Sequence, residues 1–197
     1  MPSHLTIFPR CSQAKIKNVR FLCIVGSSGA GKSEAVAFLK TLNNNRLEFP
    51  VRYTTRRPRL DDDPTENVSV AEDVFCQMLK DGQIFITWLK ELPNVGEFNY
   101  GISKPDLDDS ICVVSGNNSF AKEVKLARSL VVEIWADEQM RRRRLEARAG
   151  KLAPKELEAR LMALDSLNPT EVDIRIVNTG SKDDLGESLK ELAGLIS

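Results

Sequence analysis

The sequence predicts an α/β fold of three layers, in which a mainly parallel sheet lies between two layers of helices. Short runs rich in Val, Ile, Phe and Tyr alternate with helical patterns along most of the chain, as in parallel sheets joined by helical crossovers. A glycine-rich turn follows the first fully apolar run and leads into an amphipathic segment, which is a strand–turn–helix unit. The length of 197 residues suits one domain of this class.

The individual elements follow from local patterns, since each predicted strand is short and rich in β-branched or aromatic residues. The predicted strands are residues 20–25, 50–54, 84–89, 98–102, 111–115, 130–136 and 172–178. The predicted helices are residues 32–43, 70–81, 119–128, 137–149, 154–165 and 183–196. Residues 1–17 form a polar leader that we expect to be flexible, followed by a single domain over residues 18–197.

The composition narrows the classes of function. The 28 basic and 28 acidic residues balance, so we expect no general attraction to nucleic acid or to an anionic membrane. We find no apolar run long enough to span a bilayer and no secretory signal. The four cysteines lack metal-ligand spacing, which fits a reducing cytoplasm, and the single histidine, His4, makes a histidine base unexpected.

The turn after the first strand has the phosphate-binding pattern G-x-x-x-x-G-K-[ST], in the P-loop context of strand, turn and helix. It reads Gly26-Ser27-Ser28-Gly29-Ala30-Gly31-Lys32-Ser33. The glycines let successive backbone N–H groups point at one anion, and the start of the following helix adds its own free N–H groups. Lys32 can reach the β- and γ-phosphates and the Ser33 hydroxyl can bind Mg²⁺, so the sequence predicts a site for a nucleoside triphosphate.

Residues 50–103 interrupt the pattern, because they carry three strand candidates and one helix where a simple nucleotide-binding fold has one crossover. We interpret this stretch as an inserted acceptor-binding subdomain in a core made of residues 18–49 and 104–197.

Two arginine clusters accompany the P-loop. Residues 52–59 hold four arginines in a loop marked by Pro58. The planar guanidinium group of arginine suits phosphate recognition, so this loop is a candidate phosphate site. The alternative is a surface loop with incidental charge. Residues 141–160 look like a helix–loop–helix lid that could bring arginines over the phosphates. For Arg142 and Arg143 a solvated helix surface is the favoured interpretation.

Together these residues resemble the guanylate kinase family over roughly residues 18–197. The resemblance rests on the P-loop, on Thr54-Thr55-Arg56-Arg57-Pro58-Arg59, on Trp88 with Asn99-Tyr100-Gly101, on Arg144, Arg148 and Arg160, and on Ile176-Val177-Asn178. It implies an ATP-dependent kinase in which Lys32 and Ser33 hold the ATP phosphates and Mg²⁺. It also implies that Arg56, Arg59 and Tyr100 hold the phosphate of the acceptor, that Arg148 and Arg160 close over the transferring group, and that Asn178 lies near the adenine.

The departures from guanylate kinases bear on the acceptor. Where that family reads guanine, this chain has Arg52, Thr87, Ile102, and Ser115 with Asn117, so the carboxylate that would accept from guanine is missing. A site that loses such a partner loses roughly a factor of 10⁴ in discrimination, so the acceptor is not expected to be a guanine nucleotide.

A sister group, the ribose 1,5-bisphosphate phosphokinases, is similar at several of these positions. The similar positions are Arg52-Tyr53-x-Thr55-Arg56, Glu66-Asn67, and a small polar strand end at Ser115. This resemblance implies transfer of the γ-phosphoryl group of ATP to ribose 1,5-bisphosphate, giving phosphoribosyl diphosphate, with Arg52, Glu66, Asn67 and Ser115 at the acceptor.

Two alternatives remain open: a nucleoside monophosphate kinase with altered base preference, and a non-catalytic guanylate kinase-like module that grips a phosphorylated peptide. The second usually lacks the P-loop lysine and lid arginines, which are present here as Lys32, Arg148 and Arg160. We expect a phosphorylated small molecule as partner, and a monomer or homodimer.

Overall fold

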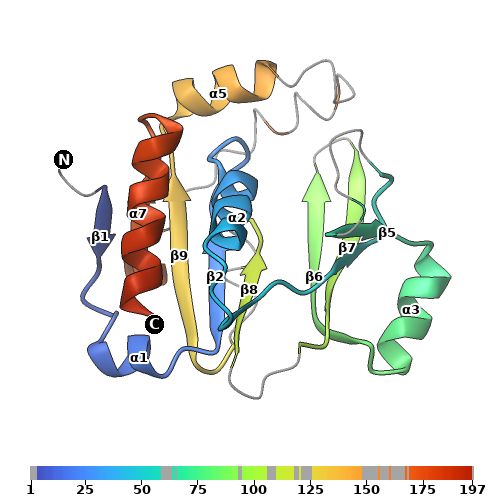
Figure 1. Ribbon diagram of the computed structural model, residues 1–197. Coiled ribbons are helices and arrows are strands. Elements are labelled where there is room, and N and C mark those ends of the chain that lie inside the picture. The colour runs from blue at the N-terminus through green and yellow to red at the C-terminus, as the bar shows by residue number, and fades with distance from the viewer. Residues whose placement is uncertain are drawn as a thin grey trace.

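A computed structural model (Figure 1) describes residues 4–58, 64, 66–92, 95–105, 110–117, 120, 126–147, 155, 160, 167 and 169–196. The described strands are β1 Leu5–Ile7, β2 Phe21–Val25, β3 Leu47–Glu48, β4 Arg52–Thr54, β5 Asn67–Ser69, β6 Ile84–Leu92, β7 Gly96–Ser103, β8 Ile111–Ser115, β9 Ser129–Trp135 and β10 Ile174–Val177. The described α-helices are α1 Gln13–Lys17, α2 Lys32–Thr41, α3 Glu72–Lys80, α5 Glu138–Glu146 and α7 Lys182–Leu195. The α/β class with a mainly parallel sheet is confirmed.

The large sheet has the strand order β1-β10-β9-β2-β8-β3 and is parallel except for β1. Its central strand β2 is buried along its whole length, with β8 on one side and β9 on the other. The parallel strands all end at one edge, and that edge is where ligands of open α/β sheets bind. Helix α5 crosses above this edge (Figure 1).

Alternate side chains of β2 enter two separate apolar cores. Leu22 and Ile24 belong to the core beneath α2 and α7, which lie side by side over one face of the sheet (Figure 1). Phe21, Cys23 and Val25 belong to a second core on the opposite face. Both faces of the sheet are therefore covered, as expected for buried parallel strands.

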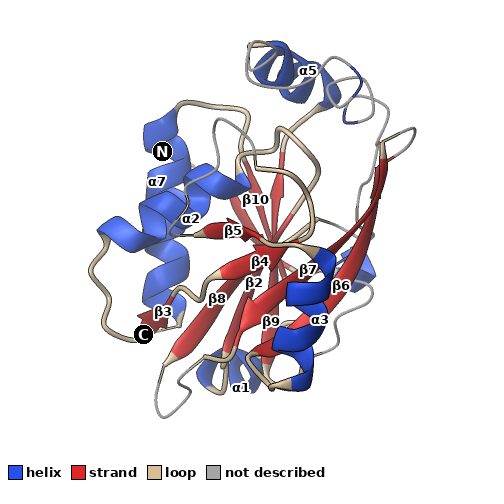
Figure 2. Cartoon of the chain, turned by 90° about the vertical axis from the view of Figure 1, so that its right-hand side faces the viewer, coloured by secondary structure: helices blue, strands red, loops and turns tan. Residues whose placement is uncertain are grey.

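A small four-stranded sheet, with the order β5-β4-β7-β6, stands beside the large one. Helix α3 covers its outer side (Figure 2), and Phe75 of α3 is buried. Its inner side chains, among them Ile86, Trp88, Tyr100 and Ile102, complete the second core. The interruption predicted over residues 50–103 corresponds to this small sheet and α3.

The predicted strands and helices that fall on described residues are largely present, with different ends. Three short strands, β1, β3 and β5, are missed, and β6 runs beyond the predicted residue 89 to Leu92. In the predicted helix 119–128, residues 126–128 are not helical, and most of the remainder lies outside the described residues. Most of the predicted helix 154–165 also lies outside them, although residues 155 and 160 are helical.

The predicted flexible leader is corrected, because residues 5–17 contain β1 and α1. Strand β1 pairs antiparallel with β10. Asp173, which is fully buried, accepts from Arg10 Nε at 2.9 Å and from Lys15 Nζ at 2.6 Å. It also accepts from the backbone N–H of Val131 at 2.7 Å, so this one carboxylate ties the N-terminal segment to the sheet.

We expect Asp173→Ala to lower the free energy of unfolding by about 3 kcal/mol, because it leaves Lys15 and the Val131 N–H without their buried acceptor. Denaturant unfolding measures the change. Asp183→Ala, on the exposed start of α7, is the control and should stay within about 0.5 kcal/mol of the wild type. Equal stabilities of the two variants would contradict the role of Asp173.

Candidate active site

The P-loop connects the buried strand β2 to helix α2, which begins at Lys32. Gly31 is the N-cap of this helix and has a φ of 107°, a left-handed conformation that side chains other than glycine rarely adopt. A Cβ at this position would also collide with the side-chain amide of Asn178. The glycine therefore permits both the turn and the close packing beneath it.

The underside of the loop is held by Asn178 and Arg144. The side-chain Nδ2 of the buried Asn178 donates to the Ala30 carbonyl at 2.8 Å, and its backbone N–H donates to Trp135 at 2.7 Å. Arg144, from α5, donates to the Asn178 carbonyl at 3.1 Å. These contacts fix the loop to the ends of β9 and β10.

Lys32 lies within the curl of the loop. Its Nζ donates to the carbonyls of Gly26 at 2.7 Å and Ser27 at 2.9 Å, and the side chain as a whole is only half-buried. Burial of the amine, followed by the positive charges of nearby lysine and arginine side chains, lowers the pKa of Lys32 from 10.5 to about 7. A ligand with phosphate oxygens would remove this penalty by supplying negative charge.

The opposite wall is the loop after β4. The Thr54 hydroxyl accepts from the Arg56 N–H at 3.2 Å, and the Thr55 hydroxyl accepts from the Asn99 N–H at 2.9 Å. The two threonines thus bind the loop to itself and to β7. Arg56 is 7% exposed, and its Nη1 donates to the Arg57 carbonyl at 2.6 Å, so the guanidinium is held in the wall of the site.

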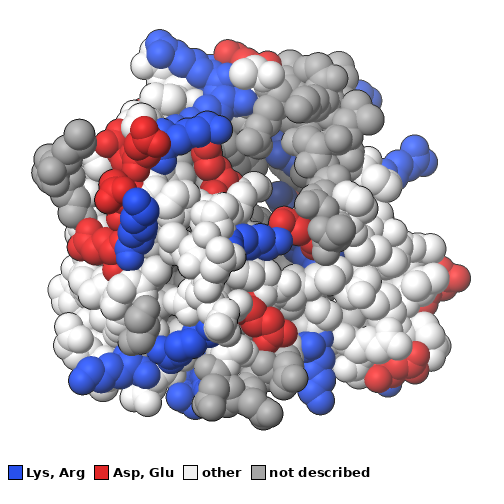
Figure 3. Space-filling model, viewed as in Figure 1, with Lys and Arg blue, Asp and Glu red and all other residues white. Residues whose placement is uncertain are grey.

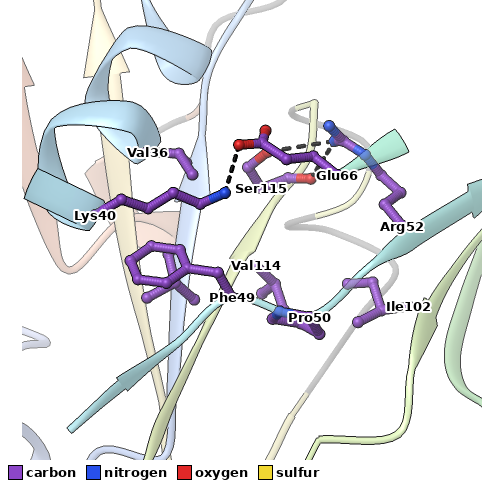
Figure 4. A pocket seen from close by; sticks show the side chains of 10 residues that line it. Val36, Lys40, Phe49, Pro50, Arg52, Glu66, Ile102, Val114 and Ser115 are labelled. Atoms are coloured by element: carbon purple, nitrogen blue, oxygen red, sulfur yellow. Dashed lines mark hydrogen bonds and ion pairs between the residues drawn. The ribbon is translucent and has the colours of Figure 1, made fainter. Parts of the chain in front are cut away.

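Three predicted acceptor residues, Glu66, Asn67 and Ser115, lie near Arg52 of β4, and Figure 4 shows Glu66 and Ser115 beside it. Arg52 Nε donates to Asn67 Oδ1 at 2.7 Å, and Nη1 donates to the Ser115 carbonyl at 2.9 Å. Beside them, Glu66 forms an ion pair with Lys40 of α2. Arg52 and the Lys40–Glu66 pair therefore link the small sheet to the large sheet and α2.

One open cleft brings the P-loop and this opposite wall together. Its predicted lining residues are Ser28, Gly29, Gly31, Lys32, Ser33, Arg52, Arg56, Glu66, Asn67, Tyr100, Ser115 and Arg160. A hollow opens on this face of the molecule, and basic and acidic side chains lie beside it (Figure 3). Gly26, Ser27 and Ala30 belong to the loop but do not line the cleft, and Asn178 lies beneath the loop, away from the cleft lining. Arg59 and Arg148 lie outside the described residues.

Lys90 lines the cleft and was not named in the sequence analysis. Trp88, Asn117 and Arg144 were named there only in the comparison with guanylate kinases and were not assigned to the site. Trp88 and Asn117 line the cleft, and Arg144 supports the P-loop from beneath. For Trp88 and Lys90 a signal exists, since the buried residues Ile84, Ile86 and Trp88 alternate along β6 with exposed ones, and the same alternation points Lys90 inward.

For a metal ion, the described residues contain no group of three or more His, Cys, Asp or Glu side chains placed to share one. Ser33, at the second position of α2, is exposed and lines the cleft. This position fits Mg²⁺ that is coordinated mainly by phosphate oxygens and contacts the protein through one hydroxyl.

No protein-family model matches the chain. The chain is 30% identical over 178 residues to a protein named ribose 1,5-bisphosphate phosphokinase PhnN from Pseudofrankia inefficax, and the match covers 86% of this chain and 87% of that protein. The chain belongs to the guanylate kinase-like P-loop kinases. The fold agrees, because the crystal structure of guanylate kinase from Anaplasma phagocytophilum matches with a TM-score of 0.57 at 16% identity, over 90% of this chain and 86% of that one.

Membership in this kinase family implies ATP as donor and a small molecule as acceptor. Across the described residues, none of the helices combines the length and the apolar character needed to traverse a bilayer.

We expect ATP binding at pH 8 to take up close to one proton. With a pKa of about 7, Lys32 is mostly neutral at pH 8, and contact with phosphate oxygens favours its ammonium form. The apparent affinity for ATP should therefore fall as the pH rises above about 7. Titration calorimetry in two buffers of different ionisation enthalpy measures the number of protons taken up on binding. This number should be about half as large at pH 7 as at pH 8. A value of zero at pH 8 would refute the lowered pKa of Lys32.

Proposed function

We propose that this protein transfers the γ-phosphoryl group of ATP to ribose 1,5-bisphosphate and so forms phosphoribosyl diphosphate. The observation that carries the proposal is the shared cleft, in which the P-loop and the Arg56 wall face each other with room between them. Phosphoryl transfer requires a binding site for the donor phosphates that faces a binding site for the acceptor phosphate. The similarity to the Pseudofrankia inefficax protein supports this acceptor.

The residues would act mainly by positioning and by charge. The P-loop amides and Lys32 would hold the donor phosphates, with Mg²⁺ at Ser33, while Arg56, Arg59 and Tyr100 would hold the acceptor. Arg148 and Arg160 would close over the transferring group. An acceptor phosphate oxygen forms the new bond to the γ-phosphorus, the bond to the β,γ-bridging oxygen breaks, and ADP leaves. A phosphate acceptor is already ionised near neutral pH, so no general base is needed.

The surroundings of Arg52 favour an acceptor other than a guanine nucleotide. Thr87, where guanylate kinases carry a base-reading Glu, is exposed and is not part of the cleft lining. Ser115, at the end of β8, accepts from Arg52. Glu66 is the one carboxylate among the described lining residues, and it is paired with Lys40. The described cleft lining is therefore mainly cationic, whereas the N–H groups of guanine would need hydrogen-bond acceptors.

An acceptor panel tests the substrate directly. ATP is the donor, and the release of ADP is measured. We expect kcat/KM for ribose 1,5-bisphosphate to exceed that for GMP by at least about 10³-fold, because the described lining of the cleft lacks the side chains with which guanylate kinases bind guanine. A preference for any nucleoside monophosphate would identify a nucleoside monophosphate kinase instead. Absence of transfer to every acceptor, together with absence of Mg²⁺-dependent ATP binding, would identify a non-catalytic module.

We expect Lys32→Ala and Arg56→Ala each to lower kcat/KM by about 10²- to 10³-fold, since each removes a cation that faces phosphate oxygens. Lys32→Ala should weaken ATP binding, and Arg56→Ala should weaken the acceptor. Arg57→Ala is the matched control, because Arg57 is exposed beside Arg56 and only its backbone carbonyl takes part in the wall. Near-normal rates for Lys32→Ala or Arg56→Ala would overturn the assignment.

The reaction is expected in the cytoplasm. All four cysteines are free thiols, which suits a reducing compartment.

A further inference from the structure

Lys90 lies on the inner face of the small sheet, directly beyond the aromatic residues that form its floor. Along β6 the inward side chains are Ile86, Trp88 and then Lys90, because successive residues of a strand point to opposite faces. Trp88 stacks on Tyr100 with ring centroids 5.4 Å apart, and both rings are buried. This stack fixes the direction of the strand at the point where Lys90 follows.

The same cleft contains Lys90, Lys32 and Arg160, which come from three separate parts of the chain. Among the neighbouring cations, Lys90 is the largest contributor to the lowered pKa of Lys32. Lys90 is therefore close to the P-loop lysine, although it belongs to the other wall. That place is the junction at which donor and acceptor phosphates must meet for transfer.

The described lining of the cleft is rich in cationic side chains, which favours an anionic ligand. The described lining has five cationic side chains, Lys32, Arg52, Arg56, Lys90 and Arg160, and one carboxylate, Glu66, which is paired with Lys40 outside the group. Cations gathered in a partly enclosed space repel one another, and the fold tolerates this where a polyanionic ligand offsets the repulsion.

We propose that Lys90 is a phosphate-binding residue of the acceptor site, which contacts the attacking phosphate of the acceptor from the small-sheet side. The proposal rests on the proposed function and deepens it, since it names a residue that selects phosphorylated acceptors. Lys90 joins Arg56 and Tyr100, which also come from the small sheet, whereas the described P-loop contacts come from the large-sheet side. For this reason Lys90 belongs to the acceptor and not to ATP.

The test compares Lys90→Met, which keeps the length of the side chain but removes its charge, with Lys90→Arg and the wild type. The P-loop is first filled with a non-hydrolysable ATP analogue, and ribose 1,5-bisphosphate, GMP and inorganic phosphate are then titrated by calorimetry. We expect Lys90→Met to raise the Kd of the phosphorylated acceptor about 10- to 100-fold, with ATP affinity changed less than about twofold. Lys90→Arg should recover most of the loss. Lys80→Met, on the exposed end of α3, is the control and should match the wild type.

The outcomes separate this inference from the proposed function. If Lys90→Met weakens acceptor binding but the wild type transfers nothing to ribose 1,5-bisphosphate, the proposed function fails and the role of Lys90 holds. If the wild type transfers the phosphoryl group and Lys90→Met binds the acceptor as tightly as before, the role of Lys90 is overturned. Equal weakening of ATP and acceptor in Lys90→Met would also overturn it, and failure of every acceptor to bind the wild type would overturn both.

Discussion

The apolar contact between the small sheet and the back of the large sheet sets the geometry on which the site depends. Phe21, Cys23 and Val25 of the central strand share one core with Trp88 and Tyr100 of the small sheet. The P-loop begins immediately after Val25, and the acceptor wall follows β4, which pairs with the strand β7 that carries Tyr100. A single buried core therefore determines how far apart the two anion-binding walls stand.

This arrangement has an electrostatic cost that the protein meets by packing rather than by charge neutralisation. Burial of the amine, followed by the positive charges of nearby side chains, lowers the pKa of Lys32 to about 7. The loop stays in place because Asn178 and Arg144 hold its carbonyls from below. The contacts of Asn178 and Arg144 thus lie beneath the loop, whereas Lys32, which donates to the Gly26 and Ser27 carbonyls, lines the cleft on the other side. The contacts that stabilise the loop lie on one face, and the groups that could bind an anion lie on the other.

The parts of the site that the sequence revealed are local. The P-loop needs only a strand, three glycines and the start of a helix, and Thr54, Thr55 and Arg56 act within one turn of chain. The ordered structure of the N-terminal segment could not be predicted in this way. It depends on the ion pair between Lys15 and Asp173, which lie 158 positions apart in the sequence. Lys90 was missed for a different reason: the predicted strand ended at residue 89, three positions before the end of β6 at Leu92, so the inward direction of Lys90 was not recognised. That Asn178 lies near the adenine stays a prediction; the sequence did not indicate that its side chain supports the loop at Ala30, which is a contact between distant segments.

The links between the two sheets also bear on how the cleft can close. Arg52 of the small sheet bonds to Ser115 at the end of β8, and Lys40 of α2 is paired with Glu66 just before β5. Both links lie at the acceptor end of the cleft, and both are short polar contacts between the main body and the small sheet. An acceptor phosphate that competes for Arg52 would loosen one of these links while drawing the walls together through its own charge. Arg52 therefore both joins the two sheets and lines the cleft.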